Sequence, residues 1–299
     1  MTNSTKHRLA AAIGFKAWRA GLAREQANET LFELDFVDIE PIHRAFAPMS
    51  RELRFDVSEM AVITALQALA YDKKLMLLPV TLAARFQHGC LITRASDHPI
   101  KPRELISRKV AVRAYTQTTG VWVRGILENE YGVAASSIDW VTQEGAHLAE
   151  YRNPPWVHQV DTDRALLDML RAGDIDAAIL GSDLPDDPDL VPVVPNPVEA
   201  SAAWYAKYHV VPTNHVMVVR TDVAEADPEA IRAFWRCVVR AKPAPKNGVD
   251  FAAIGIEAHR GPLEMLLRFC DQQALLPRAL AFDDIYAPAK KLLGDLLQN

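Results

Sequence analysis

Residues 109–141 read KVAVRAYTQTTGVWVRGILENEYGVAASSIDWV, and this stretch decides the fold class. It opens with a short apolar run at 109–113, continues with helical periodicity at 119–131 and closes with a second apolar run at 138–141. A strand, a helix and a strand in this order predict two parallel strands joined by a crossover helix. The stretch therefore favours an α/β fold.

The same alternation of short apolar runs and longer amphipathic segments continues along the chain, which predicts a largely parallel sheet. Further strands are expected at residues 9–13, 32–37, 55–57, 75–79, 89–93, 177–180 and 215–220. Further helices are expected at residues 41–49, 59–71, 163–172 and 228–241. Five prolines among acidic residues predict an irregular loop at 183–197.

Length and composition indicate a globular protein with a small partner. The chain has 299 residues, enough for two lobes, with 49% hydrophobic and 24% charged residues. The formal net charge is -5 and the basic residues are scattered, which argues against a nucleic-acid surface. No stretch reaches the roughly 18 apolar residues that a membrane span needs. Neither nucleic acid nor a membrane is therefore expected as a partner.

The three cysteines indicate a reducing cellular compartment. Cys90, Cys237 and Cys270 lie far apart and form no C-x-x-C pair, so we expect buried thiols in a reducing environment. The apolar run at residues 9–15 is short and is followed at once by Lys16, so we interpret it as the first strand rather than a secretory leader. A cytoplasmic location is therefore expected.

Several motifs point to one family. They are Phe55-Asp56-Val57-Ser58-Glu59, residues 79–92 with Arg85, Phe86 and His88, the block 109–140, and downstream residues 173–177 and 214–220. Together they resemble the 4,5-dihydroxyphthalate decarboxylase family, from about residue 9 to residue 242. Phe15 and Lys16 depart from the resemblance, because an Asp-Tyr type pair is expected after Gly14. Because this loop faces the cleft in the family fold, the departure bears on the identity of the exact substrate.

The resemblance implies an α/β, two-lobed, type II periplasmic-binding-protein-like fold. Each lobe is expected to be a mixed, mostly parallel sheet flanked by helices. Residues 1–93 and 218–299 would form lobe 1 and residues 94–217 lobe 2, with a ligand cleft between the lobes. The implied activity is removal of a carboxylate from a hydroxylated aromatic acid, without an organic cofactor.

The candidate catalytic residues are His88, His215 and Glu59. Such a decarboxylation requires protonation of the ring carbon that bears the carboxylate, and a histidine can deliver that proton near neutral pH. Both histidines lie just before strands that the family fold uses to pass between lobes, so either is a candidate donor, with Glu59 assisting. Because two histidines and a glutamate can also ligate a divalent metal, a metal requirement stays open.

The candidate binding residues are mostly polar side chains at expected helix starts, where free N–H groups and the helix dipole favour anions. Helix capping alone is the alternative for Ser58 and for the segment that follows the strand at 109–113. Arg124 could bind a carboxylate or pair with Glu128 one turn on. The full set is Phe15, Lys16, Ser58, Arg85, Tyr115, Gln117, Thr118, Thr119, Arg124 and Glu144.

Three other functions compete with a decarboxylase. A solute-binding protein or sensor for an aromatic acid would use the same cleft without proton chemistry. An enzyme of the same fold could act on a different bond, and a structural interaction protein is the third alternative. The expected partner is a small aromatic acid, and the sequence leaves homo-oligomerisation open.

Overall fold

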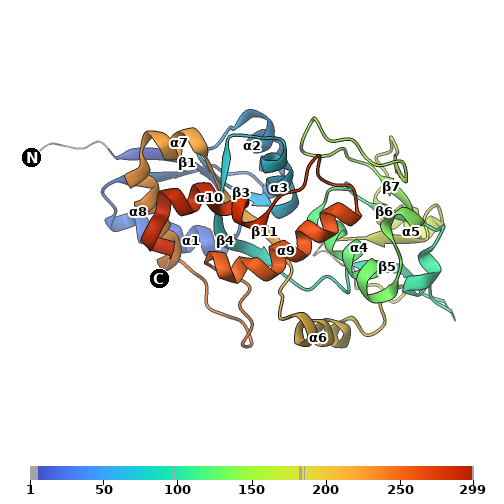
Figure 1. Ribbon diagram of the computed structural model, residues 1–299. Coiled ribbons are helices and arrows are strands. Elements are labelled where there is room, and N and C mark those ends of the chain that lie inside the picture. The colour runs from blue at the N-terminus through green and yellow to red at the C-terminus, as the bar shows by residue number, and fades with distance from the viewer. Residues whose placement is uncertain (1–5, 97, 182–183, 185, 298–299) are drawn as a thin grey trace, which may run out of the picture. The chain divides into compact units, whose positions relative to one another are not determined.

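The computed structural model describes residues 6–96, 98–181, 184 and 186–297, and it contains two compact units (Figure 1). Unit 1 comprises Met1–Arg85, Thr213–Glu264 and Arg278–Asn299, and unit 2 comprises Phe86–Pro212 and Met265–Pro277. Each unit has one mixed sheet with flanking helices. This architecture confirms the predicted α/β fold class.

The units divide the chain differently from the predicted lobes at residues 86–93, 213–217 and 265–277. The first difference arises because β5 (Leu91–Arg94) pairs with strands of the unit 2 sheet. The second arises because β11 (Thr213–Arg220) pairs with unit 1 strands along its whole length. The third segment belongs to unit 2, where Phe269 packs edge-on against Trp122.

The sheet of unit 1 has five strands in the order β2-β1-β3-β11-β4. Strands β1 and β2 are parallel, as are β1 and β3, whereas β11 runs antiparallel to both β3 and β4. The remaining bounds are β1 (His7–Ala12), β2 (Phe32–Phe36), β3 (Val57–Ala61) and β4 (Leu75–Ala84). Strand β3 thus lies in the centre of the sheet, between β1 and β11.

The helices of unit 1 include α8, whose sequence shows clearly why it forms. Asp227 caps the helix by accepting the N–H of Ala230 at 3.0 Å, and Pro228 follows at the first position. Its buried residues include Ile231, Phe234 and Val238, at the spacing of one helical face. The helices of this unit are α1 (Lys16–Glu25), α2 (Phe46–Glu52), α3 (Val62–Ala70), α7 (Thr221–Ala226), α8 (Pro228–Arg240), the first part of α9 (Ile256–Gln272) and α10 (Phe282–Leu293).

The prediction that Ser58 and Glu59 begin a helix is wrong. Both residues lie in β3, and α3 begins only at Val62, with Ala61 as its N-cap. Ser58 pairs with Val218 of β11, and the ladder continues through the following residues. Pairing on both sides of β3 is a tertiary effect, which overrides the local preference that the sequence suggested.

The sheet of unit 2 has six strands in the order β10-β5-β9-β6-β7-β8. The bounds are β6 (Lys109–Val112), β7 (Asp139–Thr142), β8 (Val157–Gln159), β9 (Ala177–Ile179) and β10 (Leu190–Pro192). Strands β6 and β7 are parallel and are joined by α4 (Thr118–Tyr131), which confirms the strand-helix-strand unit predicted for residues 109–141. The other helices are α5 (Leu166–Ala172) and α6 (Pro197–Tyr208).

The predicted loop at 183–197 is wrong in part, because β10 lies within it and pairs with β5. Strand β10 forms an edge of the sheet, where the missing N–H of Pro192 is tolerated. Residues 183 and 185 of this predicted loop lie outside the described residues. A short edge strand therefore interrupts the proline-rich segment.

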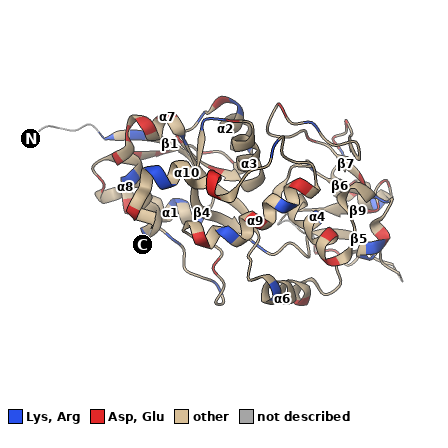
Figure 2. Cartoon of the chain, in the orientation of Figure 1, with Lys and Arg blue, Asp and Glu red and all other residues tan. Residues whose placement is uncertain are grey.

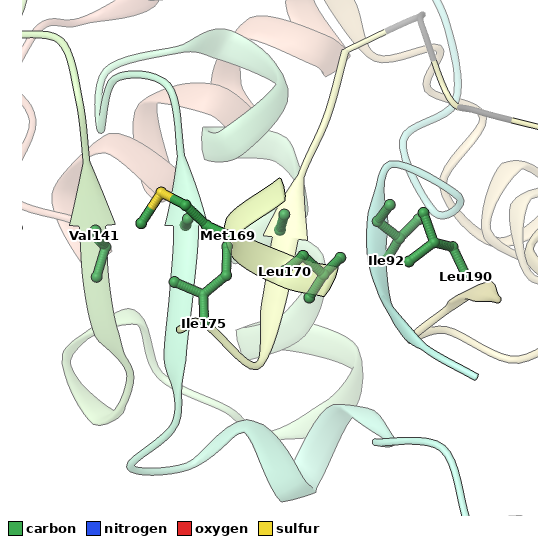
Figure 3. Packing of buried hydrophobic residues seen from close by; sticks show 8 residues of the cluster. Ile92, Val141, Met169, Leu170, Ile175 and Leu190 are labelled. Carbon is green, nitrogen blue, oxygen red and sulfur yellow. The ribbon is translucent and has the colours of Figure 1, made fainter. Parts of the chain in front are cut away.

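A cluster of apolar side chains packs within unit 2 (Figure 3). Met169 and Leu170 from α5 contribute to it together with residues of five strands. Its members are Ile92, Ala111, Val141, Met169, Leu170, Ile175, Ala178 and Leu190. Alternate strand residues such as Trp140 lie on the opposite side, so both faces of the sheet are buried, as expected for strands between helices.

Charged residues of both signs are interspersed along the elements of each unit (Figure 2). On α9, for example, Arg260 pairs with Glu257 at 3.0 Å and with Glu264 at 3.2 Å. Within the described ranges, none of the helices combines the length and the apolar composition that crossing a membrane requires.

Gly125 of α4 allows a close helix contact that a larger residue would prevent. A Cβ at this position would overlap the ring of buried Phe269, so Gly125→Ala should lower the free energy of unfolding by about 1–3 kcal/mol. Gly145→Ala is the matched control, because the nearest atom to its added Cβ is Gln159 Oε1 at 3.8 Å. Urea unfolding measures both variants, and equal midpoints would contradict the tight contact.

Candidate active site

Glu59 and His215 meet on neighbouring strands of unit 1. Glu59 pairs with Met217 across the β3–β11 ladder, and His215 lies two residues from Met217, so both side chains project from the same face of the sheet. Glu59 Oε1 and His215 Nδ1 are 2.6 Å apart. The structure therefore brings together two of the three predicted catalytic residues.

The Glu59 carboxylate is a buried and fully engaged anion. Its side chain is 1% exposed, and Oε2 accepts the backbone N–H groups of Gly14 and Phe15, each at 2.9 Å. Burial alone would raise the pKa of Glu59, but the hydrogen bond and charge of His215 and the two amides together lower this pKa below its ordinary value. Glu59 is therefore ionised near neutral pH and acts as an acceptor, not as an acid.

This carboxylate determines which nitrogen of His215 carries a proton. An ionised Glu59 only accepts hydrogen bonds, so Nδ1 of His215 must carry the hydrogen that lies between them. Nε2 is then the nitrogen available for proton transfer, and in the part of the chain that the structure describes it has no hydrogen-bond partner. The His215 side chain is 26% exposed, so solvent or a ligand can reach it.

Phe46 is a site residue that the sequence did not single out. Its ring lies edge-on to the His215 imidazole, with centroids 5.2 Å apart. Its position in a predicted helix at 41–49 carried no signal of this contact, since an aromatic residue on a helix most often belongs to the core. Phe46 supplies an apolar wall beside the imidazole.

The loop between β1 and α1 lies directly against Glu59. Gly14 is required there because a Cβ would come within 2.5 Å of Cβ of Ile42. Phe15 follows with 43% of its surface exposed, and Lys16 is the first residue of α1, also exposed. A cation at a helix N-terminus is opposed by the helix dipole, at a cost of about 0.3–1 kcal/mol. Lys16 thus places a positive charge at the end of the helix that disfavours it, next to the loop that Glu59 binds. Such a departure from local preference is typical of functional positions.

Two further candidates from unit 1 differ in what they can contact. Ser58 is completely buried, and its hydroxyl donates to the carbonyl oxygen of Glu59 at 2.7 Å, so it serves the backbone of β3. Arg85 is the residue after β4, where unit 1 ends, and is half-buried. Of these two, only Arg85 presents surface to solvent.

His88 belongs to unit 2 and is held in a structural environment. The Ser201 hydroxyl donates to the carbonyl oxygen of Pro197 at 2.6 Å, so Nδ1–H of His88 donates to this hydroxyl at 3.0 Å. The residue is 3% exposed, and the ring of Trp204 lies edge-on to it. Burial lowers the pKa of His88 to about 4, so the imidazole is neutral at pH 7.

The segment from Tyr115 to Thr119 forms the start of α4, as predicted. Gln117 is the N-cap, and its carbonyl accepts the N–H of Val121 at 3.1 Å. Thr118 and Thr119 are almost completely buried. The hydroxyl of Tyr115 accepts the indole N–H of Trp156 at 3.0 Å, so it has a structural partner. As at any helix start, the first amides of α4 favour an anion.

Arg124 belongs to the same helix, and its side chain is buried in the interior of unit 2. Among the ion pairs of the described residues it does not pair with Glu128, so the predicted Arg124–Glu128 pair is wrong. Its Nε donates to Gln273 Oε1 at 2.7 Å and its Nη2 donates to the carbonyl oxygen of Tyr115 at 2.5 Å. The guanidinium also stacks over the ring of Tyr115, 3.9 Å from its centroid, and it is completely buried. Burial lowers its pKa. Arg124 therefore braces the loop before α4 from inside the unit.

Glu144, the last of the binding candidates, lies after β7 and pairs with Arg113 at 3.1 Å near the surface.

No group of three or more His, Cys, Asp or Glu side chains in the described parts of the chain is arranged to hold a metal ion. Cys90, Cys237 and Cys270 are buried thiols that form no disulfide, as predicted.

Two proteins named 4,5-dihydroxyphthalate decarboxylase are similar to this chain. The protein from Comamonas testosteroni is 27% identical over 208 residues, which cover 63% of this chain and 60% of the relative. The protein from Pseudomonas putida is 25% identical over 181 residues, which cover 56% of this chain and 67% of the relative. The chain thus spans about three fifths of the first relative's length. No family model matches the chain.

Solved structures are also similar to the chain. The desulfurization enzyme DSZB aligns with a TM-score of 0.55 and 13% identity, covering 98% of this chain and 99% of that chain. The periplasmic aliphatic sulphonate binding protein SsuA from Escherichia coli aligns with a TM-score of 0.49 and 10% identity, covering 96% and 84%. The likeness to DSZB shows a common fold, while such low identity does not extend to activity.

Acid should destabilise the protein through His88. Its pKa falls from 6.5 to about 4 on folding, so the unfolded chain binds more protons between these values. The free energy of unfolding should therefore rise with pH through this window, by up to about 1.4 kcal/mol per pH unit for this residue, and should gain nothing more from it at higher pH. His88→Asn should flatten the slope measured by urea unfolding at pH 4.5–6.5. His209→Asn, at an exposed position, is the control, and equal slopes in both variants would contradict the prediction.

Proposed function

We propose that the protein removes a carboxylate from a hydroxylated aromatic acid of the 4,5-dihydroxyphthalate kind, with His215 as the proton donor. The observation that carries the proposal is the buried Glu59 carboxylate 2.6 Å from His215 Nδ1, which leaves Nε2 for proton transfer. The names of the two similar proteins support the reaction class.

The proposed reaction needs one proton and no organic cofactor. The His215 imidazolium gives its Nε2 proton to the ring carbon that bears the carboxylate, while a ring hydroxyl releases electron density into the ring. The bond between that carbon and the carboxylate then breaks, its electron pair restores the aromatic ring, and carbon dioxide leaves. The new ring hydrogen is the proton from His215, and the imidazole recovers a proton from water.

Glu59 has two roles in this scheme. As an ionised acceptor it orients the ring of His215 and stabilises its protonated form, in the way that a buried carboxylate supports a catalytic histidine in serine hydrolases. It also holds the loop at Gly14 and Phe15 through their N–H groups. Since burial is offset by three hydrogen bonds, Glu59 does not need to change protonation during the reaction.

His215 suits the donor role better than His88 does. His88 is almost completely buried, and its low pKa keeps it neutral, so it holds no acidic proton at pH 7 other than the one bonded to Ser201. His215 has a carboxylate partner and an accessible side chain. A general acid requires both a proton to give and a path to the substrate.

Recognition of the substrate falls first to Phe15 and Lys16. The backbone N–H groups of Gly14 and Phe15 are occupied by Glu59, so they cannot also bind a substrate carboxylate. The exposed ring of Phe15 can instead pack against an aromatic substrate, and the charge of Lys16 can attract its carboxylate. In unit 2, the start of α4 is a second candidate for binding a carboxylate.

Incubation of the purified protein with 4,5-dihydroxyphthalate and related hydroxylated benzoates should release carbon dioxide from at least one of them. The assay follows carbon dioxide and the decarboxylated ring product together, since the two must appear in equal amounts. Tight binding of one of these acids without turnover, measured by calorimetry, would instead support the solute-binding protein or sensor.

His215→Asn should lower kcat by about 10²–10⁴-fold, because the amide N–H of Asn can keep the bond to Glu59 while the proton of Nε2 is lost. Glu59→Gln should also lower kcat, because its amide would donate to Nδ1 and reverse which nitrogen carries the proton. His209→Asn is the matched control at an exposed position. Steady-state kinetics measures all three variants, and wild-type kcat in His215→Asn would eliminate His215 as the donor.

A further inference from the structure

Unit 1 contains a second histidine with two buried partners. His259 Nδ1 lies 2.6 Å from the hydroxyl oxygen of Tyr286, and Nε2 lies 3.2 Å from Thr81 Oγ1 and 3.3 Å from the carbonyl oxygen of Ala253. These residues come from α9, α10, β4 and the segment before α9. The three side chains are between 0% and 2% exposed, so the network is closed to solvent.

The contacts assign the hydrogens of this network. The carbonyl oxygen of Ala253 only accepts, so Nε2 of His259 carries the hydrogen that points to it. Nδ1 is then bare and accepts the O–H of Tyr286. Burial lowers the pKa of His259 to about 4, which agrees with a neutral ring. His259 thus links a phenol on one side to the backbone next to β4 on the other.

The network lies at an irregular part of the sheet. Across the ladder of β4 with β11, Val216 pairs with Thr81 but the next residue, Met217, pairs with Leu78, so residues 79–80 bulge out of the ladder. Residues 253–255 form hydrogen bonds with the backbone groups of this bulge, on the edge of β4 that does not pair with β11. Their bonds are Thr81 N–H to the Ala253 carbonyl at 2.9 Å and Gly255 N–H to the Pro79 carbonyl at 2.8 Å.

His215 of β11 lies next to this bulge, one residue before Val216. It pairs with Ala83 of β4 on one side and Ala61 of β3 on the other, and register shifts occur on both sides of it in the β4 ladder. A β-bulge bends a strand and re-aims the side chains near it. The direction of the imidazole toward Glu59 therefore depends on how the bulge in β4 is held.

We propose that His259, Tyr286 and Thr81 form a positioning network for His215. The network fixes residues 253–255 against the bulge in β4, and the bulge sets how β11 presents the imidazole to Glu59. None of the three side chains touches the substrate in this scheme. Their part in catalysis rests on the proposed function, whereas their effect on the geometry of His215 does not.

Tyr286→Phe tests the network by removing only the hydroxyl that bonds to His259. We expect the imidazole nitrogen resonances and the titration midpoint of His215, followed by NMR, to shift from those of the wild type. With a substrate that turns over, kcat should fall by up to about a hundredfold at nearly constant KM, because the donor is misplaced while binding is intact.

Two variants complete the experiment. Thr81→Val removes the hydroxyl at the bulge at nearly constant volume, and it decides the question if Tyr286→Phe does not fold. Tyr151→Phe is the matched control, since it removes a phenol that bonds to the Ala274 carbonyl within unit 2. It should leave the resonances of His215 unchanged.

Unchanged resonances and titration of His215 in the folded Tyr286→Phe and Thr81→Val variants would overturn the positioning network. Absence of turnover by the wild-type protein would count against the decarboxylase alone, because the NMR measurement needs no substrate. A uniform loss of folded protein, without a shift of His215 in the folded fraction, would assign the network to stability and would also overturn the proposal.

Discussion

The geometry of unit 1 depends on one buried charge, the carboxylate of Glu59. An ion removed from water is costly unless hydrogen bonds compensate for it. Here the compensation comes from the amides of Gly14 and Phe15 and from His215, so a single side chain ties the end of β1 and strand β11 to β3. The chain's own anion thereby occupies the two amides that directly precede α1.

The fold class follows from local periodicity. The predictions that were wrong concern elements whose bounds depend on pairing with distant strands. The β6-α4-β7 unit was predictable because each element carries its own pattern within residues 109–141. Residues 60–71 are mostly apolar, and such a run does not show where a central strand ends and a buried helix begins. Strand β10 has three residues and is defined by its partner β5, so its own sequence carries little signal.

The candidate site was predictable as a set of residues but not as an arrangement. Glu59 and His215 are separated by 156 positions, so only the β3–β11 register shows that they are diagonal neighbours. Nothing in the sequence distinguishes His88 from His215 as the proton donor. Burial distinguishes them, because His88 is enclosed by Ser201 and Trp204 while His215 keeps an accessible face. Arg124 likewise has the helical spacing of a surface ion pair but lies in the interior.

The bond from Arg124 to Gln273 has a consequence for biosynthesis. Most of unit 2 is complete at Pro212, yet the acceptor for this buried guanidinium arrives only with residues 265–277, after the chain has returned to unit 1. During translation the Arg124 guanidinium therefore lacks this acceptor until residues 265–277 have been made. Unit 2 can therefore complete its interior only after residues 213–264, which belong to unit 1, have also been made.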